Sequence, residues 1–452
     1  MHRPRLLFAA PSSGSGKTTV TCGILQTLKN RGKQVFSFKC GPDYIDPMFQ
    51  EKIIGVRAGT LDLFFSEENT LRRLFCRNAE GADLSVIEGV MGFYDGLGPD
   101  TDEASTYHVA RVLQAPVVLI INARGQALSA LAELNGFLRF RKGSGIRGVI
   151  FNQMSEHVFK ALEPEVRKMG ILPVGFLPKA GDLVIKSRHL GLITPGEISD
   201  LNDRLQKLAA LLEQTINLEA LLQLAEEAPE LSCPPDPIIP PMPETRLAVA
   251  RDEAFCFLYR DNLQLLERYG AMLSYFSPLH DAGLPEGTQG LLLPGGYPEL
   301  YAEALSGNSA MRDAVAGAIR KGLPCLAECG GFLYLHRELE DMDDVFRPMA
   351  GVLDARAFRT DRLGHFGYVT LQAAADSAFF RKGEQIRAHE FHYYDSEDCG
   401  SAMRAEKPAG NRSWTCIHAE GNLFAGFPHL FYESNPGPVE RFLRRCAEKG
   451  GI

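Results

Sequence analysis

The chain alternates short apolar runs with segments in which apolar positions recur every three or four residues. The apolar runs read RLLFAA, QVFSFK, LSVIEGV, APVVLIINA and RGVIFN in the first half, and RLAVA, GLLLPGG and GLPCLAE in the second. Such runs predict buried β-strands, and the segments between them predict helices. Strands that alternate with helices are typical of parallel sheets covered on both faces. We therefore expect an α/β protein with doubly wound, mainly parallel sheets, whose ligands bind at the carboxyl ends of the strands.

A proline-rich segment separates the two halves. Residues 232–245, SCPPDPIIPPMPET, contain six prolines in fourteen positions, which disfavours a helix or a central strand and predicts a stiff, extended connector. Leucines at helical spacing over 201–231 predict two amphipathic helices before it, and a new strand begins at Arg246. The predicted domains are 1–231 and 246–452, with 232–245 as the linker.

Composition and charge narrow the class of protein. The chain has 452 residues, a net charge of -8 and 45% hydrophobic residues, as expected for a globular protein of two or three domains. A net negative charge argues against general nucleic-acid binding. The longest apolar run, 115–123, is too short to span a membrane. Ten cysteines without a regular framework predict reduced thiols and a cytoplasmic location. A homodimer is the default oligomeric state.

A phosphate-binding loop is predicted where the strand RLLFAA runs into PSSGSGKTTV and then into a helix. Gly14 and Gly16 allow the backbone to curl around phosphate oxygens at a helix N-terminus. Lys17 would reach the terminal phosphates, and the Thr18 hydroxyl would join a Mg²⁺ shell. Pro11 stands where the pattern GxxxxGK[ST] has its first glycine, so the loop is a variant. The predicted ATP-binding residues are Gly14, Ser15, Gly16, Lys17, Thr18 and Thr19.

Acidic residues follow two further strands of the first half. Glu88 ends the strand LSVIEGV, where an acidic residue completes the Mg²⁺ site of P-loop enzymes. Asp43 and Asp46 lie in KCGPDYIDP and could bind metal or orient an acceptor substrate, although aspartates in a turn are often only structural. Tyr44 and Asp95 are further acceptor-site candidates, and Asp95 is also suited to cap local backbone. The predicted magnesium ligands are Thr18, Glu88 and Asp43.

Cys329 is the candidate nucleophile of the second half. The stretch GLPCLAECGGFLYL predicts a strand, a sharp turn and a helix start, with Cys329 at the tip of the turn. That arrangement is a nucleophile elbow, in which a helix N-terminus is expected to lower the thiol pKa. A buried core cysteine explains the residue equally well. The presence of a phosphate-binding loop in the first half favours the nucleophile.

Several motifs together resemble one family. APSSGSGKTT, FKCGPDYIDP and VIEGVMGFYDG are similar to segments of the corrinoid a,c-diamide synthases, and LLLPGGYPEL and AECGGFLYL to their glutamine amidotransferase domain. The resemblance implies a P-loop amidoligase domain, similar to dethiobiotin synthetase, fused to a class I-like glutaminase. It implies amidation of the a and c carboxylates of cobyrinic acid with ATP, Mg²⁺ and L-glutamine, in cobalamin biosynthesis. Hydrogenobyrinic acid and nickel sirohydrochlorin remain alternative substrates.

The resemblance also assigns the glutaminase residues. His429, in FAGFPHLFYES, matches the catalytic histidine of the family, and His392, in HEFHYYDSE, is the competing candidate with a supporting role. The turn glycines Gly295 and Gly296, with Gly330 after the cysteine, would form the oxyanion hole. Class I glutaminases carry HxE where this chain reads HLF, so we expect a Cys329–His429 dyad.

Two further expectations concern the substrate and the function class. A polycarboxylate substrate requires a local cationic patch on an acidic chain, and Lys39, Arg57 and Arg124 are candidate members. A different class, a non-catalytic P-loop regulatory or sensor protein with an inactive glutaminase-like domain, is compatible with the same fold.

Overall fold

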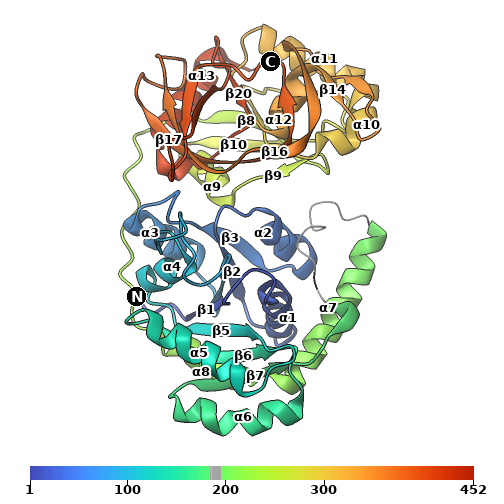
Figure 1. Cartoon of the computed structure of the whole chain (residues 1–452). Coiled ribbons are helices and arrows are strands. Elements are labelled where there is room, and N and C mark those ends of the chain that lie inside the picture. Colours follow the sequence, from blue (N-terminus) through green and yellow to red (C-terminus); the bar gives the residue numbers. More distant parts are fainter. Residues whose placement is uncertain (184, 186–194, 452) are drawn as a thin grey trace. The chain divides into compact units, whose positions relative to one another are not determined.

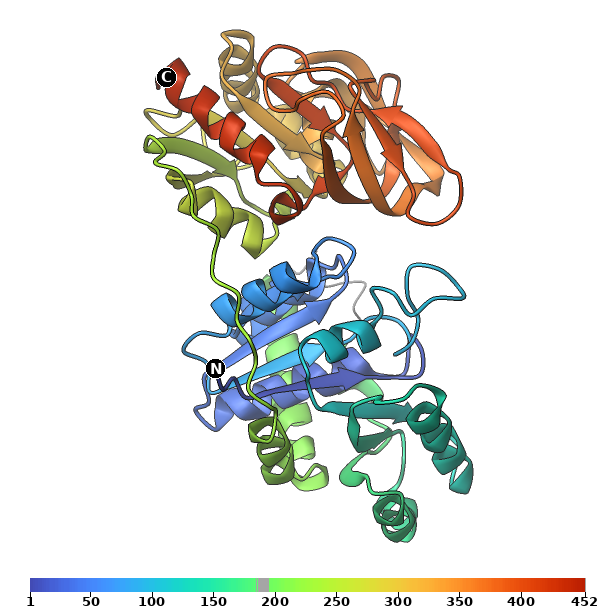
Figure 2. The same ribbon diagram turned by 90° about the vertical axis from the view of Figure 1, so that its left-hand side faces the viewer.

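The computed structural model describes residues 1–183, 185 and 195–451, with the side chains of 182 and 195–199 left aside. The chain folds as two compact units, Met1–Asp236 and Pro237–Ile452 (Figure 1). The division falls inside the proline-rich segment, where residues 229–244 carry no helix or strand and run as an extended connector (Figure 2). No helix within the described ranges combines the length and the apolar character needed to cross a bilayer.

The first unit is built on a seven-stranded sheet in the order β3-β2-β4-β1-β5-β6-β7, in which every neighbouring pair is parallel. Its strands are β1 (Arg5–Ala9), β2 (Val35–Cys40), β3 (Arg57–Leu61), β4 (Leu84–Glu88), β5 (Val117–Asn122), β6 (Ile146–Asn152) and β7 (Leu172–Leu177). The strands are almost continuously buried, as expected when helices cover both faces of a parallel sheet.

Helices cover both faces of this sheet through two separate apolar clusters. One cluster takes in α3 (Glu68–Asn78), α4 (Thr106–Val112), α5 (Leu128–Phe140) and α6 (Glu156–Lys168). The other takes in α1 (Lys17–Asn30), α2 (Ile45–Phe49), α7 (Pro195–Thr215) and α8 (Leu218–Glu226), with the π-helix η1 (Gln50–Ile54) and the 3-10 turn η2 (Gly181–Leu183) nearby. The two amphipathic helices predicted over 201–231 correspond to α7 and α8.

The second unit contains a five-stranded parallel sheet in the order β10-β8-β11-β13-β20. Its strands are β8 (Thr245–Ala250), β10 (Ala271–Phe276), β11 (Gly290–Leu293), β13 (Cys325–Glu328) and β20 (Leu423–Gly426). The helices of this unit are α9 (Arg260–Arg268), α10 (Ala302–Gly307), α11 (Ser309–Arg320), α12 (Gly330–Leu335) and α13 (Gly437–Lys449), with 3-10 turns η4 (Pro298–Tyr301) and η5 (Tyr432–Ser434). The predicted α/β class is confirmed for both units.

A second, mainly antiparallel sheet was not foreseen in this unit. Its strands are β14 (His336–Glu340), β15 (Phe346–Pro348), β16 (Leu353–Ala373), β17 (Gln385–Ser396), β18 (Met403–Glu406), β19 (Ser413–Cys416) and β21 (His429–Leu430). A short pair, β9 (Phe255–Phe257) with β12 (Gly295–Gly296), lies apart from it. The long strands β16 and β17 are half-exposed and rich in charged residues, so they lack the apolar runs that mark parallel strands.

One cysteine pair contradicts the prediction that all thiols are reduced. Cys76, in the last turn of α3, is disulfide-bonded to Cys233 at the start of the proline-rich segment, with their Cα atoms 5.9 Å apart. Asp236 lies 3.5 Å from the Arg73 guanidinium and 3.6 Å from that of Arg77, on the same helix. The sequence could not indicate this bond, because 157 positions separate the two cysteines and only the fold brings α3 beside the connector.

Candidate active sites

The predicted phosphate-binding loop lies between β1 and α1, at the carboxyl edge of the parallel sheet. Gly14 and Gly16 have φ angles of 79° and 95°, in the left-handed region that favours glycine. The Asn152 side chain, at the end of β6, donates a 2.9 Å hydrogen bond to the Ser15 carbonyl. A Cβ atom on Gly16 would lie 2.2 Å from the Asn152 Nδ2 atom, so only glycine fits here. Asn152, which the sequence did not single out, therefore braces the loop.

The Lys17 side chain folds back over this loop. Its ammonium donates to the Met91 carbonyl at 2.5 Å and to the Ser12 carbonyl at 3.3 Å. Burial, followed by the charge of Lys39, lowers the pKa of Lys17 to about 8. A nucleotide phosphate that binds the Lys17 ammonium would therefore have to replace these two carbonyls.

The two threonines after Lys17 point in different directions. The Thr18 hydroxyl donates a 2.7 Å hydrogen bond to Glu88 Oε1, which places Thr18 beside the end of β4. The Thr19 hydroxyl instead accepts from the Ile185 backbone N–H at 3.1 Å. Of the two hydroxyls, that of Thr18 is the one positioned to join a metal shell.

A buried lysine joins the two carboxylates at the strand ends. The Lys39 ammonium lies 2.7 Å from Glu88 Oε1 and 2.6 Å from Asp46 Oδ2, and all three side chains are buried. Lys39 and Glu88 are direct partners in the pairing of β2 with β4. Although burial opposes it, the nearby carboxylates raise the Lys39 pKa well above its ordinary value, so the lysine stays charged. Lys39 was a candidate member of a local cationic patch, but it is buried and its charge is taken up by two carboxylates.

The oxygens around Lys39 fit a magnesium ion. Glu88 Oε2 and Asp46 Oδ1 are buried and have no hydrogen-bond partner, and the Thr18 hydroxyl is beside them. Oxygen donors of this kind suit Mg²⁺, which usually keeps only one or two protein carboxylates and takes its other ligands from water and substrate phosphates. Among the described residues, no three His, Cys, Asp or Glu side chains could enclose a metal by themselves. The cluster is therefore suited to a nucleotide-bound metal.

The predicted acceptor residues lie next to this cluster. Asp43 Oδ1 accepts from the backbone N–H groups of Ile45 and Asp46 at 2.8 and 3.2 Å, at the start of α2. Burial and the charge of Asp46 raise the pKa of Asp43 to about 7. Tyr44 is buried beside it. Asp95 Oδ2 accepts from the Gly92 backbone at 2.9 Å, the local capping role considered from the sequence.

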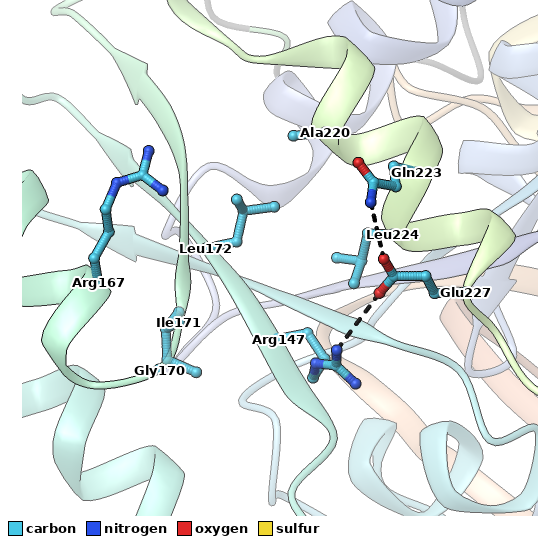
Figure 3. A pocket seen from close by; sticks show the side chains of 9 residues that line it. All are labelled: Arg147, Arg167, Gly170, Ile171, Leu172, Ala220, Gln223, Leu224 and Glu227. Carbon is cyan, nitrogen blue, oxygen red and sulfur yellow. Dashed lines mark hydrogen bonds and ion pairs between the residues drawn. The ribbon is translucent and has the colours of Figure 1, made fainter.

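A surface cavity of about 360 Å³ lies away from the phosphate-binding loop (Figure 3). Arg147 and Leu172 line it at the starts of β6 and β7, whereas the loop lies at the carboxyl ends of the strands. Glu227 is 3.5 Å from the Arg147 guanidinium and accepts from Gln223 at 3.1 Å, so three of the polar side chains of this cavity are paired with one another. None of the residues that line this cavity belongs to the phosphate-binding loop or to the turn at Cys329.

Cys329 occupies the turn between β13 and α12, as predicted. Its φ and ψ angles are 45° and −101°, an uncommon conformation for a residue with a Cβ atom. Its backbone N–H donates to the Gly426 carbonyl at 2.8 Å, which fixes the turn against β20. The thiol is buried, with the residue only 5% exposed, so the elbow does not present it to bulk water.

The predicted lowering of the Cys329 pKa is wrong. Burial raises the pKa of the thiol, and the carboxylates of Glu299 and Glu390 raise it further. A helix of only six residues, α12, does not outweigh desolvation and two neighbouring negative charges. The thiol is therefore protonated at rest and needs a base to become a nucleophile.

His429 and the oxyanion glycines meet at this turn. A Cβ atom on Gly295 would lie 2.2 Å from His429 Cε1, and one on Gly330 would lie 2.8 Å from the Gly296 nitrogen. Burial, with the charges of His389 and His392, lowers the pKa of His429 to about 3. A neutral imidazole can accept the thiol proton. Three segments distant in sequence are thus brought to one place.

The competing histidine has partners of its own. The His392 ring stacks on Phe427 at 3.9 Å, its Nδ1 atom is 2.5 Å from the Tyr394 carbonyl, and its Nε2 atom is 3.3 Å from Glu390 Oε2. Both its ring nitrogens are engaged in supporting contacts. Glu390 and Glu299, which affect Cys329, were missed by the sequence reasoning.

The position two residues after His429 holds no acid. Phe431 is buried there and packs edge-on against Tyr259 at 5.8 Å. Glu433, two residues further on, lies 3.6 Å from the Arg268 guanidinium. The dyad stays a prediction.

The fold and the domain matches define a class of protein, a P-loop nucleotide-binding unit joined to a glutamine amidotransferase unit. Residues 6–192 match the CobQ/CobB/MinD/ParA nucleotide binding domain, and residues 246–437 match the CobB/CobQ-like glutamine amidotransferase domain. A cobyrinate a,c-diamide synthase of Caldanaerobacter subterraneus is 38% identical over 98% of both chains. One from Gloeobacter violaceus is 40% identical over 98% of this chain and 96% of its own. The chain belongs to the cobyrinate a,c-diamide synthase family, whose members are glutamine-dependent, amide-forming ligases.

Proposed function

We propose that the protein amidates the a and c carboxylates of cobyrinic acid, with ATP as energy source and L-glutamine as nitrogen donor, in cobalamin biosynthesis. The observation that carries the proposal is the presence in one chain of a P-loop beside buried carboxylates and of a cysteine elbow beside a histidine. Relatives named for this reaction match almost the whole chain. The reaction needs both a carboxylate-activating site and an ammonia-producing site.

The ligase unit would activate the carboxylate. The backbone of Gly14 to Thr19 and the Lys17 ammonium would bind the ATP phosphates. Thr18 and Glu88 would hold Mg²⁺, which neutralises phosphate charge when bound. Asp46, whose Oδ1 atom has no hydrogen-bond partner, takes the place predicted for Asp43, whose Oδ1 atom already accepts from two backbone N–H groups. Lys39 keeps Glu88 and Asp46 in place. A carboxylate oxygen of the substrate attacks the γ-phosphorus, which gives an acyl phosphate and releases ADP. Ammonia then attacks the acyl carbon, phosphate leaves with the bonding electrons, and an amide remains.

The glutaminase unit would supply that ammonia. His429 accepts the Cys329 proton, and the thiolate attacks the side-chain amide carbon of glutamine. The backbone N–H groups of Gly296 and Gly330, whose residues pack against each other, would bind the resulting oxyanion. The imidazolium returns the proton to the leaving nitrogen, and ammonia departs. Water, deprotonated by His429, then cleaves the thioester and releases glutamate.

Two variants test this division of labour. Cys329→Ser is expected to abolish glutamine-dependent amidation and to retain amidation from ammonium salts. Lys17→Ala is expected to abolish amidation from either nitrogen source, because both need the activated carboxylate. Cys399→Ser, which changes a half-buried thiol outside the proposed site, is the control for the first variant. Loss of the ammonium-driven reaction in Cys329→Ser, or its survival in Lys17→Ala, would contradict the scheme.

The substrate and the function class are tested by the same assay. Turnover measured in parallel with cobyrinic acid, hydrogenobyrinic acid and nickel sirohydrochlorin is expected to favour cobyrinic acid, and a preference for either alternative would correct the proposal. Glutamine hydrolysis by the purified chain would contradict the alternative of a non-catalytic sensor. The cytoplasmic location and the homodimer stay predictions.

A further inference from the structure

A carboxylate that the scheme above does not use lies next to the nucleophile. Glu299 belongs to η4, the 3-10 turn that directly follows the oxyanion strand β12. A Cβ atom on Gly330 would lie 2.9 Å from Pro298 Cδ, so the segment that carries Glu299 packs directly on the residue after Cys329. Of the neighbouring charges, that of Glu299 is the one that most raises the pKa of the Cys329 thiol. The turn that carries Glu299 therefore packs against the residue that follows the proposed nucleophile.

Glu299 has no counter-ion among the residues that the structure describes. In the described part of the chain, no Lys, Arg or His side chain lies within ion-pair distance of its carboxylate, which bonds only to its own backbone N–H. Burial raises the pKa of this half-buried carboxyl to about 7. A carboxylate withdrawn from water without a cation costs free energy, which a bound cation would offset.

The other carboxylate near Cys329 already has such a partner. His392 Nδ1 lies 2.5 Å from the Tyr394 carbonyl, and His392 Nε2 lies 3.3 Å from Glu390 Oε2. Glu390 therefore has a basic side chain within hydrogen-bond distance. Among the described residues, Glu299 is the one of the two carboxylates without such a partner.

The nitrogen donor supplies the missing charge. Glutamine carries an α-ammonium group three carbon atoms from the amide carbon that Cys329 attacks, so the ammonium must lie near the nucleophile but not in contact with it. We propose that Glu299 binds the α-ammonium group of glutamine and thereby selects the free amino acid as nitrogen donor. The inference rests on the glutaminase half of the proposed function and adds the group that recognises its substrate.

Kinetics with two substrates test the assignment. Glu299→Gln keeps the shape of the side chain and removes its charge. A charged hydrogen bond contributes enough for its loss to raise the KM for L-glutamine by about 10- to 100-fold, with little change in kcat. Glutaramate, which has the same amide but no α-ammonium, is expected to be hydrolysed equally by both proteins. Glu303→Gln, at an exposed position in the adjoining α10, is the matched control.

The outcomes separate recognition from damage. An equal loss with both substrates, or an unchanged KM for glutamine, would overturn the assignment. Glu299→Asp, which keeps the charge, is expected to recover part of the affinity and shows that the site still folds. Glutamine hydrolysis needs no macrocycle, so failure of the wild-type chain to amidate cobyrinic acid would contradict the proposed function without changing the result for Glu299.

The pH dependence gives a second readout. The charge of Glu299 acts on the thiol of Cys329 and the phenol of Tyr394, both with pKa values raised mainly by burial, and the charge of Glu390 acts on the same thiol. Protonated Glu299 does not attract an ammonium group, so the wild-type KM for glutamine should fall as pH rises through about 7. This fall in KM should be absent when glutaramate is the substrate and in the Glu299→Gln variant. Its persistence in the variant would contradict the proposal.

Discussion

Replacing Lys39 by methionine is expected to destabilise the ligase unit strongly. The Lys39 ammonium is the cation between Glu88 and Asp46, at 2.7 and 2.6 Å, and all three residues are buried. Methionine fills much of the same volume but leaves two carboxylates without a charge partner. Breaking a buried ion pair by removing one partner typically costs about 3–5 kcal/mol. For a unit of this size each kcal/mol corresponds to about 2–4 °C, so we expect its melting temperature to fall by roughly 6–20 °C.

The direction in which the stability loss changes with pH shows whether the two buried carboxyls cause it. Burial already raises the pKa of Glu88, and loss of the lysine raises the pKa values of the buried carboxyls further. In the variant these carboxyls stay protonated in the folded state at pH values where the unfolded chain has released the same protons. The stability lost relative to the wild-type chain should therefore be small near pH 5 and should grow as pH rises to about 8. Thermal unfolding of the full chain at several pH values, followed by calorimetry, measures this.

Two companion variants make the experiment decisive. Lys33→Met changes an exposed lysine in the turn before β2 and should have little effect. Lys39→Met/Glu88→Gln removes one of the orphaned charges and should regain part of the lost stability. A deficit that does not change with pH, or that the second substitution deepens, would refute the view that Lys39 acts as the buried counter-ion.

Two further variants probe other parts of the chain. In Gly295→Ala the new methyl group would lie 2.2 Å from His429 Cε1, so the imidazole ring must move. Because a misplacement of about 1 Å can cost that much, glutamine hydrolysis should fall about 100-fold, whereas ammonium-driven amidation should stay unchanged. An equal loss of both activities would point to general damage. Arg5→Met removes a buried guanidinium that donates to the carbonyls of Leu113 and Pro229 at 2.6 and 2.8 Å. Calorimetry should show that the free energy of unfolding falls by about 2–4 kcal/mol. An unchanged free energy of unfolding would mean that water replaces the arginine.

The sequence allowed much of the parallel architecture to be predicted, because strands buried on both faces are apolar throughout. The elements around Lys17 and Cys329 followed from the same pattern together with local glycines. The antiparallel sheet was missed because β16 mixes charged and apolar positions along a half-exposed strand.

The details of the sites depended on packing that no local pattern records. A lysine at the end of a strand is usually exposed, and only the pairing of β2 with β4 shows Lys39 to be buried against Glu88. The pKa of Cys329 is raised by desolvation rather than lowered by the helix N-terminus, because the packed fold buries the thiol. Glu299 was overlooked because a glutamate in a turn gives no sign that its charge is left without a partner.

The contacts of Lys17 change how nucleotide binding should be viewed. Its ammonium donates to the carbonyls of Ser12 and Met91, and the loop itself is braced by Asn152. A phosphate that binds Lys17 must replace these two carbonyls. The affinity for ATP then depends on the difference in free energy between the two sets of contacts, so a change that shifts the Met91 backbone should alter it without changing any residue predicted to bind the nucleotide.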